Sequence, residues 1–146
     1  MTLILQGSKA LLPILLLCFL AVTAVSSQSP FYTQFLWQHI DFPRSNIAQD
    51  YCGVMMRQRG MTRPCKNTNS FVHISKKDIK DMCTWAATYY RRNLRLSKKE
   101  VPVTTCFLER TAPNRCFYWS YTGKRYIYIS CDKKGWPVHF EETNFM

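Results

Sequence analysis

Residues 101–140 read VPVTTCFLERTAPNRCFYWSYTGKRYIYISCDKKGWPVHF and are rich in β-branched and aromatic residues. Apolar and polar residues alternate along much of this run, which is the pattern of strands with one buried face. The hairpin turn between the middle two strands is predicted at residues 122–124, where Thr-Gly-Lys interrupts the pattern. The sequence thus predicts strands at residues 101–109, 115–121, 125–131 and 136–140.

The N-terminal half carries helical signals instead. Phe31, Phe35 and His39 recur at every fourth position, which places all three on one helix face as two aromatic anchors and a histidine. Ser75 is a typical N-cap, and residues 69–74 fit one further strand. Helices followed by strands indicate an α+β domain with an antiparallel sheet. The predicted helices are residues 31–40, 50–58 and 76–82.

The first 27 residues have the composition of a secretory signal peptide. Lys9 precedes an apolar run over residues 10–25, and two small serines follow it. A membrane anchor is the alternative, but the run is short for a span and Pro13 interrupts it. We therefore expect cleavage after Ser27, which leaves one secreted, extracellular domain at residues 28–146.

The chain is strongly basic, with 20 lysines and arginines, nine acids and a formal net charge of +11. Lys9 is the one charged residue in the predicted signal peptide, so the mature domain keeps a charge of +10. Such a charge on a small secreted domain favours polyanions: RNA, heparan-type glycans or anionic cell surfaces. Charge alone does not choose among these partners, and solubility is an alternative reason for it.

Cysteine usage points to a disulfide framework. Seven cysteines are present, and Cys18 leaves with the signal peptide. An even set of six in a small secreted domain predicts three disulfides, which six cysteines can form in fifteen ways. A zinc site is the competing use, but no two cysteines have CxxC spacing and the compartment is oxidising. The six are Cys52, Cys65, Cys83, Cys106, Cys116 and Cys131.

Three side chains in separate strings have the chemistry to cleave a phosphodiester without a metal. They are His39 in WQHID, Lys66 in CKNTNSF and His139 in GWPVHFEE. One imidazole takes a proton, the other gives one, and a fixed cation holds the charge that builds on phosphorus. The alternatives are structural histidines and a solvated lysine. His73, the remaining histidine, has no chemical partner near it in sequence and is assigned such a structural role.

These strings and the order of the cysteines resemble the pancreatic-type ribonuclease superfamily, and its angiogenin-like branch most closely. Like that branch, the chain has no further cysteine in the segment directly after Cys83. The resemblance implies a disulfide-stapled α+β domain with three short helices and a curved antiparallel β-sheet. It also implies that His39 is the general base, His139 the general acid and Lys66 the stabilising cation. The disulfides it implies are Cys52–Cys106, Cys65–Cys116 and Cys83–Cys131.

Substrate-binding roles follow from the resemblance one residue at a time. Gln38 and the backbone N–H of Phe140 would bind phosphate oxygens, and Asn69 would brace the segment around the lysine. Ser70 stands where the family has a threonine that reads the pyrimidine edge with its N–H and hydroxyl, and serine keeps both groups. Glu141 stands where most members have an aspartate hydrogen-bonded to the acid histidine, so this longer carboxylate would orient the ring less well.

Three further features bear on rate and partners. Glu142 stands where the angiogenin branch tends to have a glutamine that blocks the pyrimidine pocket, and glutamate would either obstruct it or swing away. Residues 57–61, RQRGM, resemble that branch's nuclear-targeting arginine segment, although Gln58 interrupts it; a basic helix end is the alternative. Residues 84–99, TWAATYYRRNLRLSKK, fit a basic aromatic loop that contacts RNA, heparan chains or a membrane, or a plain exposed loop.

The sequence therefore predicts a secreted, metal-independent endoribonuclease that cleaves RNA 3′ to pyrimidines through a 2′,3′-cyclic phosphate. It needs no cofactor, and an angiogenic or host-defence role is expected, with nuclear entry after uptake as a further expectation. RNA is the expected substrate, a ribonuclease inhibitor, heparan-type glycans and anionic cell surfaces are the expected partners, and the expected state is a monomer. The alternative is a cationic antimicrobial or cell-surface-binding protein whose basic surface matters more than turnover.

Overall fold

The computed structural model describes residues 28–142, so the predicted signal peptide and its cleavage site lie outside the described residues. Within this range, no helix is long and apolar enough to cross a membrane. The helices are α2 (Pro30–His39), α3 (Tyr51–Gln58) and α4 (Lys76–Asp81). The strands are β1 (Thr68–Val72), β2 (Ala87–Arg91), β3 (Leu94–Ser97), β4 (Val101–Ala112), β5 (Arg115–Arg125), β6 (Tyr128–Cys131) and β7 (Pro137–Phe140).

Each of these helices begins at a side chain that accepts a hydrogen bond from a backbone N–H of the first turn. Such caps satisfy amide groups that have no partner inside the helix. The cap oxygens belong to Ser29, Asp50 and Ser75, and their hydrogen bonds measure 3.1, 3.2 and 3.1 Å. The three predicted helices are thereby confirmed to within one residue at each end.

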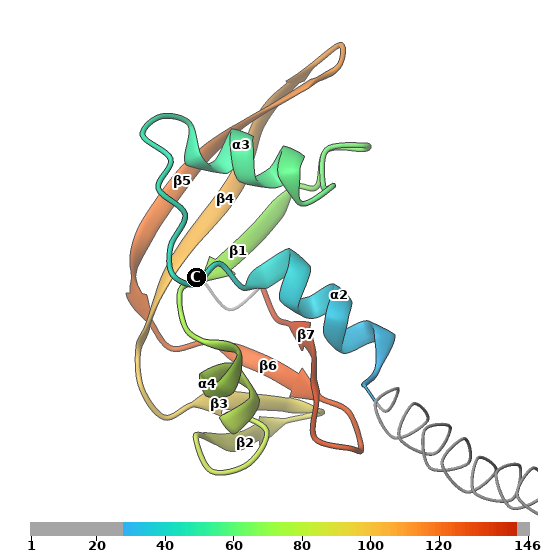
Figure 1. Ribbon diagram of the computed structural model, residues 1–146, viewed down its shortest axis with the longest axis vertical. Coiled ribbons are helices and arrows are strands. Elements are labelled where there is room, and N and C mark those ends of the chain that lie inside the picture. Colours follow the sequence, from blue (N-terminus) through green and yellow to red (C-terminus); the bar gives the residue numbers. More distant parts are fainter. Residues whose placement is uncertain (1–27, 143–146) are drawn as a thin grey trace, which may run out of the picture.

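The strands form two antiparallel sheets, in the orders β1-β4-β5 and β2-β3-β6-β7. Figure 1 shows the first sheet with α3 in the upper part of the molecule and the second sheet with α4 below it. Helix α2 lies between the two parts and packs beside β7 and β1 (Figure 1). The α+β class and the strand predicted at residues 69–74, now β1, are confirmed.

The turn predicted at residues 122–124 is wrong, because β5 is one continuous strand. It pairs with β4 along its length, and Gly123 lies opposite Val103 within that ladder. The strands are joined earlier, by a tight turn where Asn114 has φ 61°, a left-handed conformation that asparagine tolerates. Long-range pairing with β4 therefore overrides the local glycine signal. The strand predicted at residues 125–131 is also shorter, since β6 starts at Tyr128 and belongs to the other sheet.

Residues 84–99 contain a hairpin, not the predicted loop. Strands β2 and β3 pair from Ala87 opposite Ser97, and the turn between them contains Arg92 with φ 55°. After Ala87 every residue of β2 is exposed, and Tyr89 is 69% exposed. An edge strand with neither face buried leaves no alternation of apolar and polar residues, so the sequence carried no strand signal here.

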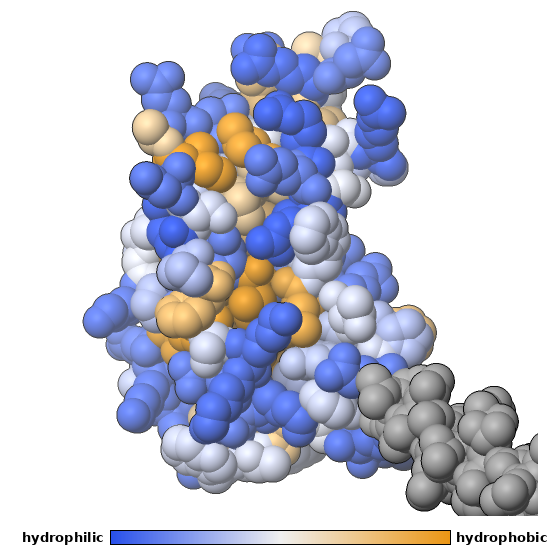
Figure 2. Space-filling view, in the orientation of Figure 1, coloured by the Kyte–Doolittle hydropathy of each residue, from blue (hydrophilic) through white to orange (hydrophobic). Residues whose placement is uncertain are grey.

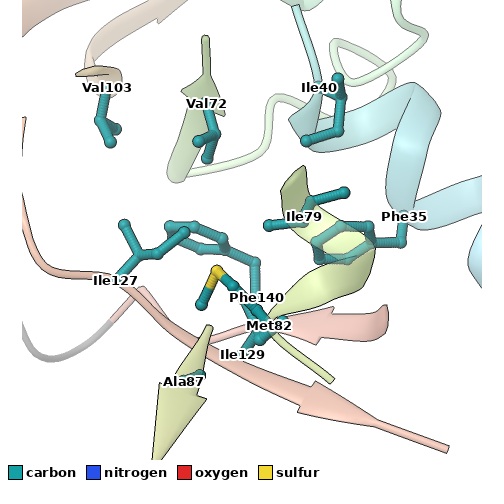
Figure 3. Close-up of a cluster of buried hydrophobic side chains, with 10 residues drawn as sticks. All are labelled: Phe35, Ile40, Val72, Ile79, Met82, Ala87, Val103, Ile127, Ile129 and Phe140. Atoms are coloured by element: carbon teal, nitrogen blue, oxygen red, sulfur yellow. The ribbon is translucent and has the colours of Figure 1, made fainter. Parts of the chain in front are cut away.

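Two hydrophobic clusters stabilise the domain. Figure 3 shows the first, to which α2, α4 and strands of both sheets contribute: Phe35, Ile40, Val72, Ile79, Met82, Ala87, Val103, Ile127, Ile129 and Phe140. The second packs α3 against β1, β4 and β5 through Tyr51, Cys52, Met55, Met56, Met61, Phe71, Cys106 and Tyr118. Phe35 anchors α2 in the first cluster as predicted, but Phe31 is 65% exposed and anchors nothing there, so that part of the prediction is wrong.

Three disulfides join elements that are distant in sequence. They are Cys52–Cys106, Cys65–Cys116 and Cys83–Cys131, the pairing that the family resemblance implies. The first lies inside the second hydrophobic cluster, where both cysteines are almost fully buried. The third ties the segment after α4 to β6, so it holds the lower part of the molecule together.

Removing the disulfide between Cys83 and Cys131 should lower the free energy of unfolding. We expect the double variant Cys83→Ala/Cys131→Ala to lose about 4 kcal/mol, because the bond closes a loop of 48 residues and restricts the unfolded chain. Both cysteines are only partly buried, so the cavity left behind adds little. Urea unfolding followed by circular dichroism measures the difference, and an unchanged transition midpoint would contradict it.

Polar residues cover most of one face of the molecule (Figure 2). Figure 2 shows one face covered mainly by hydrophilic residues, with hydrophobic residues visible in separate patches between them. Arg59, within the RQRGM segment, is not free on this surface, because its guanidinium donates hydrogen bonds to the carbonyls of Trp37 and Ile40 at the end of α2. Of the two arginines in that segment, only Arg57 is exposed, which favours the helix-end interpretation; nuclear entry stays a prediction.

Candidate active site

A cleft of about 320 Å³ lies between α2, β7 and the segment that precedes β1. It collects the predicted triplet from three distant parts of the chain, since His39 ends α2, Lys66 precedes β1 and His139 lies on β7. Its lining is Phe31, Gln34, Phe35, Gln38, His39, Lys66, Val138, His139, Phe140, Glu141 and Glu142.

His39 is buried and held in a single orientation. Its Nδ1 lies 2.9 Å from the backbone carbonyl oxygen of Ser70, and since a carbonyl only accepts, Nδ1 carries the hydrogen. The lone pair of the neutral ring is therefore on Nε2. The ring stacks on Phe140 with centroids 5.0 Å apart and also contacts Phe35. Burial holds the pKa of His39 well below its usual 6.5, with Lys66 and His139 adding to the effect and the Ser70 bond opposing it.

Lys66 is positioned by two contacts. Its ammonium donates to Asn69 Oδ1 at 2.8 Å, and the Asn69 amide donates to the carbonyl of Gln38 at 2.9 Å. Asn69 thus links the lysine to the end of α2, the bracing that the resemblance implies. Burial lowers the pKa of Lys66, which Glu142 partly offsets. The second contact was missed from sequence: the Tyr118 hydroxyl on β5 donates to the backbone carbonyl of Lys66 at 2.7 Å.

His139 is the exposed member of the triplet. Its side chain is 55% exposed, and Nε2 lies 3.7 Å from Glu141 Oε2, beyond hydrogen-bonding distance. The glutamate thus forms an ion pair with His139 only when the ring is protonated, and such partly exposed pairs contribute little energy. That this longer carboxylate orients the ring less tightly than an aspartate would stays a prediction.

Glu142 belongs to the cleft lining and contacts Ser70 on β1. Its Oε1 accepts from the Ser70 backbone N–H at 2.7 Å, and its Oε2 accepts from the Ser70 hydroxyl at 2.7 Å. The Glu142 side chain therefore points toward Ser70 and does not swing away from it; that it obstructs a pyrimidine pocket stays a prediction. Burial raises the pKa of Glu142, while the Ser70 bonds, Lys66 and Arg125 oppose the shift. Arg125, which also reaches Ser70, carries no local sequence signal and was missed.

His73 lies outside this cleft and has ordinary structural contacts. Its Nδ1 donates to the backbone carbonyl of Asp41 at 2.8 Å, and Nε2 accepts from the Thr104 hydroxyl at 2.9 Å. Both ring nitrogens are thus satisfied in the protein interior. The structural role predicted for this histidine agrees with its position.

A disulfide-linked α+β domain that brings two histidines and a lysine to one cleft has the architecture of the pancreatic-type ribonucleases. Sequence comparison supports this class directly, because the family described as pancreatic ribonuclease matches residues 30–141. Angiogenin-4 of Mus musculus is 36% identical over 135 residues, which cover 90% of this chain and 93% of that protein. Angiogenin of Mus musculus is 42% identical over 115 residues, covering 78% of this chain and 79% of that protein.

Solved structures agree with the sequence matches. Green turtle egg white ribonuclease superposes with a TM-score of 0.71 at 41% identity, covering 78% of this chain and 98% of that one. Zebrafish RNase5 superposes with a TM-score of 0.67 at 36% identity, covering 77% and 93% of the two chains. The chain belongs to the pancreatic ribonuclease family, and it is an endoribonuclease of that type.

Proposed function

We propose that this protein is a secreted, metal-independent ribonuclease that cleaves RNA 3′ to pyrimidines. The observation that carries the proposal is the cleft itself, where a buried neutral imidazole, a lysine and a second imidazole converge. RNA supplies its own nucleophile, the 2′-hydroxyl. The protein therefore needs only a base, an acid and a cation, and no resident metal or cofactor.

The proposed roles combine what the family resemblance implies with the position of each group. His39 Nε2 takes the proton of the 2′-hydroxyl, because Nδ1 is committed to Ser70. His139, whose side chain is exposed in the cleft lining, gives a proton to the departing 5′-oxygen, and Lys66 stabilises the charge on phosphorus. The product is a 2′,3′-cyclic phosphate, and its hydrolysis uses the two histidines in exchanged roles. Gln38 and the Phe140 N–H are proposed to bind phosphate oxygens.

Base recognition is proposed for Ser70. Its N–H and hydroxyl are the two groups that would meet the O2 and N3 edge of a pyrimidine, and both are now engaged by the carboxylate of Glu142. That carboxylate occupies the place of the base, so substrate binding has to displace two charge-assisted hydrogen bonds. We therefore propose low turnover in the wild-type protein.

Replacing Glu142 with alanine should raise activity. In the variant Glu142→Ala no carboxylate occupies the proposed base site. We take the closed state to lower kcat/KM about tenfold, so opening the site should raise kcat/KM for CpA by about the same factor. The control is Glu109→Ala, which removes an exposed carboxylate on β4 at a distance from the cleft lining. A fall in kcat/KM for Glu142→Ala, with Glu109→Ala unchanged, would mean that Glu142 assists the reaction instead of obstructing it.

The direct test is cleavage of CpA, UpA and ApA by refolded, disulfide-bonded residues 28–146 in the presence of EDTA. We expect cleavage of the two pyrimidine substrates, with a transient 2′,3′-cyclic phosphate visible by phosphorus NMR. Cleavage of ApA at the same rate as CpA and UpA would contradict the proposed pyrimidine specificity. Loss of all cleavage in EDTA would contradict the proposed metal independence.

A second candidate function concerns the β2–β3 hairpin. It exposes Tyr89 and Tyr90 next to Arg91 and Arg92, and the Arg91 guanidinium lies 5.2 Å from the Tyr90 ring centroid. Basic aromatic surfaces bind anionic membranes and glycans, which would serve a host-defence role. Co-sedimentation of the His39→Ala variant with anionic vesicles tests this candidate without cleavage; no binding at physiological salt would exclude a membrane target.

The physiological role is proposed from the relatives. Those that match over most of this chain are named angiogenins, so we propose an extracellular angiogenic or host-defence role. A ribonuclease inhibitor and heparan-type glycans are proposed partners of the monomer, since its surface is strongly basic. An endothelial-cell proliferation assay with wild type and His39→Ala separates an effect that needs cleavage from one that does not.

A further inference from the structure

The face of the first sheet that carries Ser70 continues beyond it as a row of aromatic side chains. Residues directly opposite in a ladder, and residues two apart along a strand, lie on the same face. Ser70 is opposite Thr105, and Thr105 is opposite Tyr121. In the next row toward the β4–β5 turn, Phe107 is opposite Trp119. We call four residues of this face the aromatic strip: Tyr121, Trp119, Phe107 and Phe117, which is two residues from Trp119 on β5.

The aromatic strip is exposed, and its central ring is held in place. Helix α3 packs on the opposite face of the sheet, against Phe71 and Tyr118. Trp119 is 52% exposed and Tyr121 is 59% exposed. The Trp119 ring stacks on Phe107, with centroids 4.4 Å apart and an angle of 19° between the ring planes. An indole fixed in this way presents a flat apolar surface to the solvent.

Cations flank the far end of the aromatic strip. The guanidinium carbon of Arg110 lies 3.7 Å from the Phe117 ring centroid, and that of Arg115 lies 4.6 Å from it. Strands β4 and β5 contain one acid, Glu109, and four bases: Arg110, Arg115, Lys124 and Arg125. Exposed rings with guanidinium groups between them are typical of surfaces that bind single-stranded nucleic acid, because bases stack on the rings and the cations neutralise phosphates.

We infer that the aromatic strip binds unpaired RNA bases on the 5′ side of the cleaved bond, so that the enzyme favours longer single strands over dinucleotides. The inference rests on the proposed pyrimidine site at Ser70, which lies on the same face of the sheet. His139, the proposed acid, protonates the nucleotide on the 3′ side and lies on β7 in the other sheet. The strip instead follows β4 and β5 to their turn, away from β7 (Figure 1), and is therefore assigned to the 5′ side.

The spacing of the aromatic strip suits an extended strand and not a duplex. Side chains that follow one another on one face of a strand are about 7 Å apart. Stacked bases along one strand of a duplex are about 3.4 Å apart. Bases placed on Tyr121, Trp119 and Phe117 are therefore separated from one another, each on its own ring. Unpaired RNA can separate its bases in this way, whereas the bases of a duplex stay paired and stacked.

The test uses substrates with one cleavable bond, a single ribocytidine followed by deoxyadenosine. Adding three deoxyadenosines on the 5′ side should lower KM about tenfold relative to the dinucleotide. In Trp119→Ala the two KM values should become nearly equal, whereas Trp119→Phe keeps a ring and should retain most of the difference. Tyr126→Ala is the matched control, because Tyr126 is also 52% exposed but lies just beyond β5, outside the strip. Three deoxyadenosines added on the 3′ side carry the same charge, and their effect should not depend on Trp119.

Binding is measured separately from cleavage with an all-deoxy oligonucleotide, which lacks the 2′-hydroxyl nucleophile. Its Kd should rise about tenfold in Trp119→Ala. Arg110→Gln should make log Kd less dependent on log salt concentration, by about 0.7 for one lost phosphate contact. Thermal unfolding of each variant checks that it is folded.

Three results would overturn the inference. The first is a KM for the 5′-extended substrate that is the same in wild type and Trp119→Ala. The second is a gain from the 3′ extension that Trp119→Ala abolishes. The third is weaker binding of Trp119→Ala to anionic vesicles or heparan chains with unchanged oligonucleotide binding, which would assign the strip to a membrane or a glycan. If wild type cleaved none of these substrates, the proposed function would fail, and the Kd of the all-deoxy oligonucleotide would still decide whether the strip binds nucleic acid.

Discussion

Replacing His39 with alanine should lower kcat for CpA cleavage by roughly 10³-fold, within the range of a positioned general base. The Nδ1 of His39 is committed to the Ser70 carbonyl, so the lone pair of the neutral ring is on Nε2, the atom proposed as the base. Burial keeps the pKa of this ring below its usual 6.5. The base is therefore active while neutral and is lost as the pH falls through that lowered pKa. The acid limb of kcat/KM against pH should thus lie below 6.5 in wild type.

The matched control is the other buried histidine. His73→Asn keeps a donor for the Asp41 carbonyl and lies outside the cleft, so folded His73→Asn should cleave CpA at close to the wild-type rate. Stopped assays across pH 4–8, with the folded fraction measured by circular dichroism, compare the two variants. If His39→Ala kept more than a tenth of wild-type kcat, or kept the acid limb, His39 would not be the base.

Local signals in the sequence were sufficient for the helices. Ser29, Asp50 and Ser75 each cap a helix through a bond to an amide two or three residues away, a range that a sequence pattern can reach. The bounds of the strands depended on pairing partners that are distant in sequence instead. Gly123 looked like a turn residue, yet β4 pairs with it across 20 residues of chain. The exposed β2 strand has no buried face, so no alternation marked it.

The residues of the candidate site are also of two kinds: some are marked by local sequence, and others depend on partners that are distant in sequence. His39, Lys66 and His139 could be predicted because each stands in a distinctive string and the chemistry needs those residue types. The residues that contact this site from β5 could not be predicted. Tyr118 reaches the Lys66 carbonyl, and Arg125 reaches Ser70, across 52 and 55 residues of sequence. Both come from β5, whose register against β4 is a property of the folded sheet and not of any short motif.

Replacing Lys66 with alanine should lower kcat for CpA by roughly 10²-fold and change KM little, as for loss of one donor that stabilises transition-state charge. The reason is its placement. Lys66 is partly buried in the cleft, and contacts from Asn69 and Tyr118 fix its side chain and its backbone. A cation fixed in advance stabilises charge that develops on phosphorus more than it stabilises the ground state.

Two further variants make the Lys66 result specific. Lys66→Arg keeps the charge but not the compact ammonium that fits Asn69 Oδ1, so it should recover only part of the lost rate. Lys124→Ala removes an exposed lysine of β5 and should leave kcat unchanged. A rise in KM at constant kcat for Lys66→Ala would show that this lysine binds RNA as one more cation of a basic surface. If Lys66→Ala and Lys124→Ala had the same kcat, Lys66 would have no catalytic role.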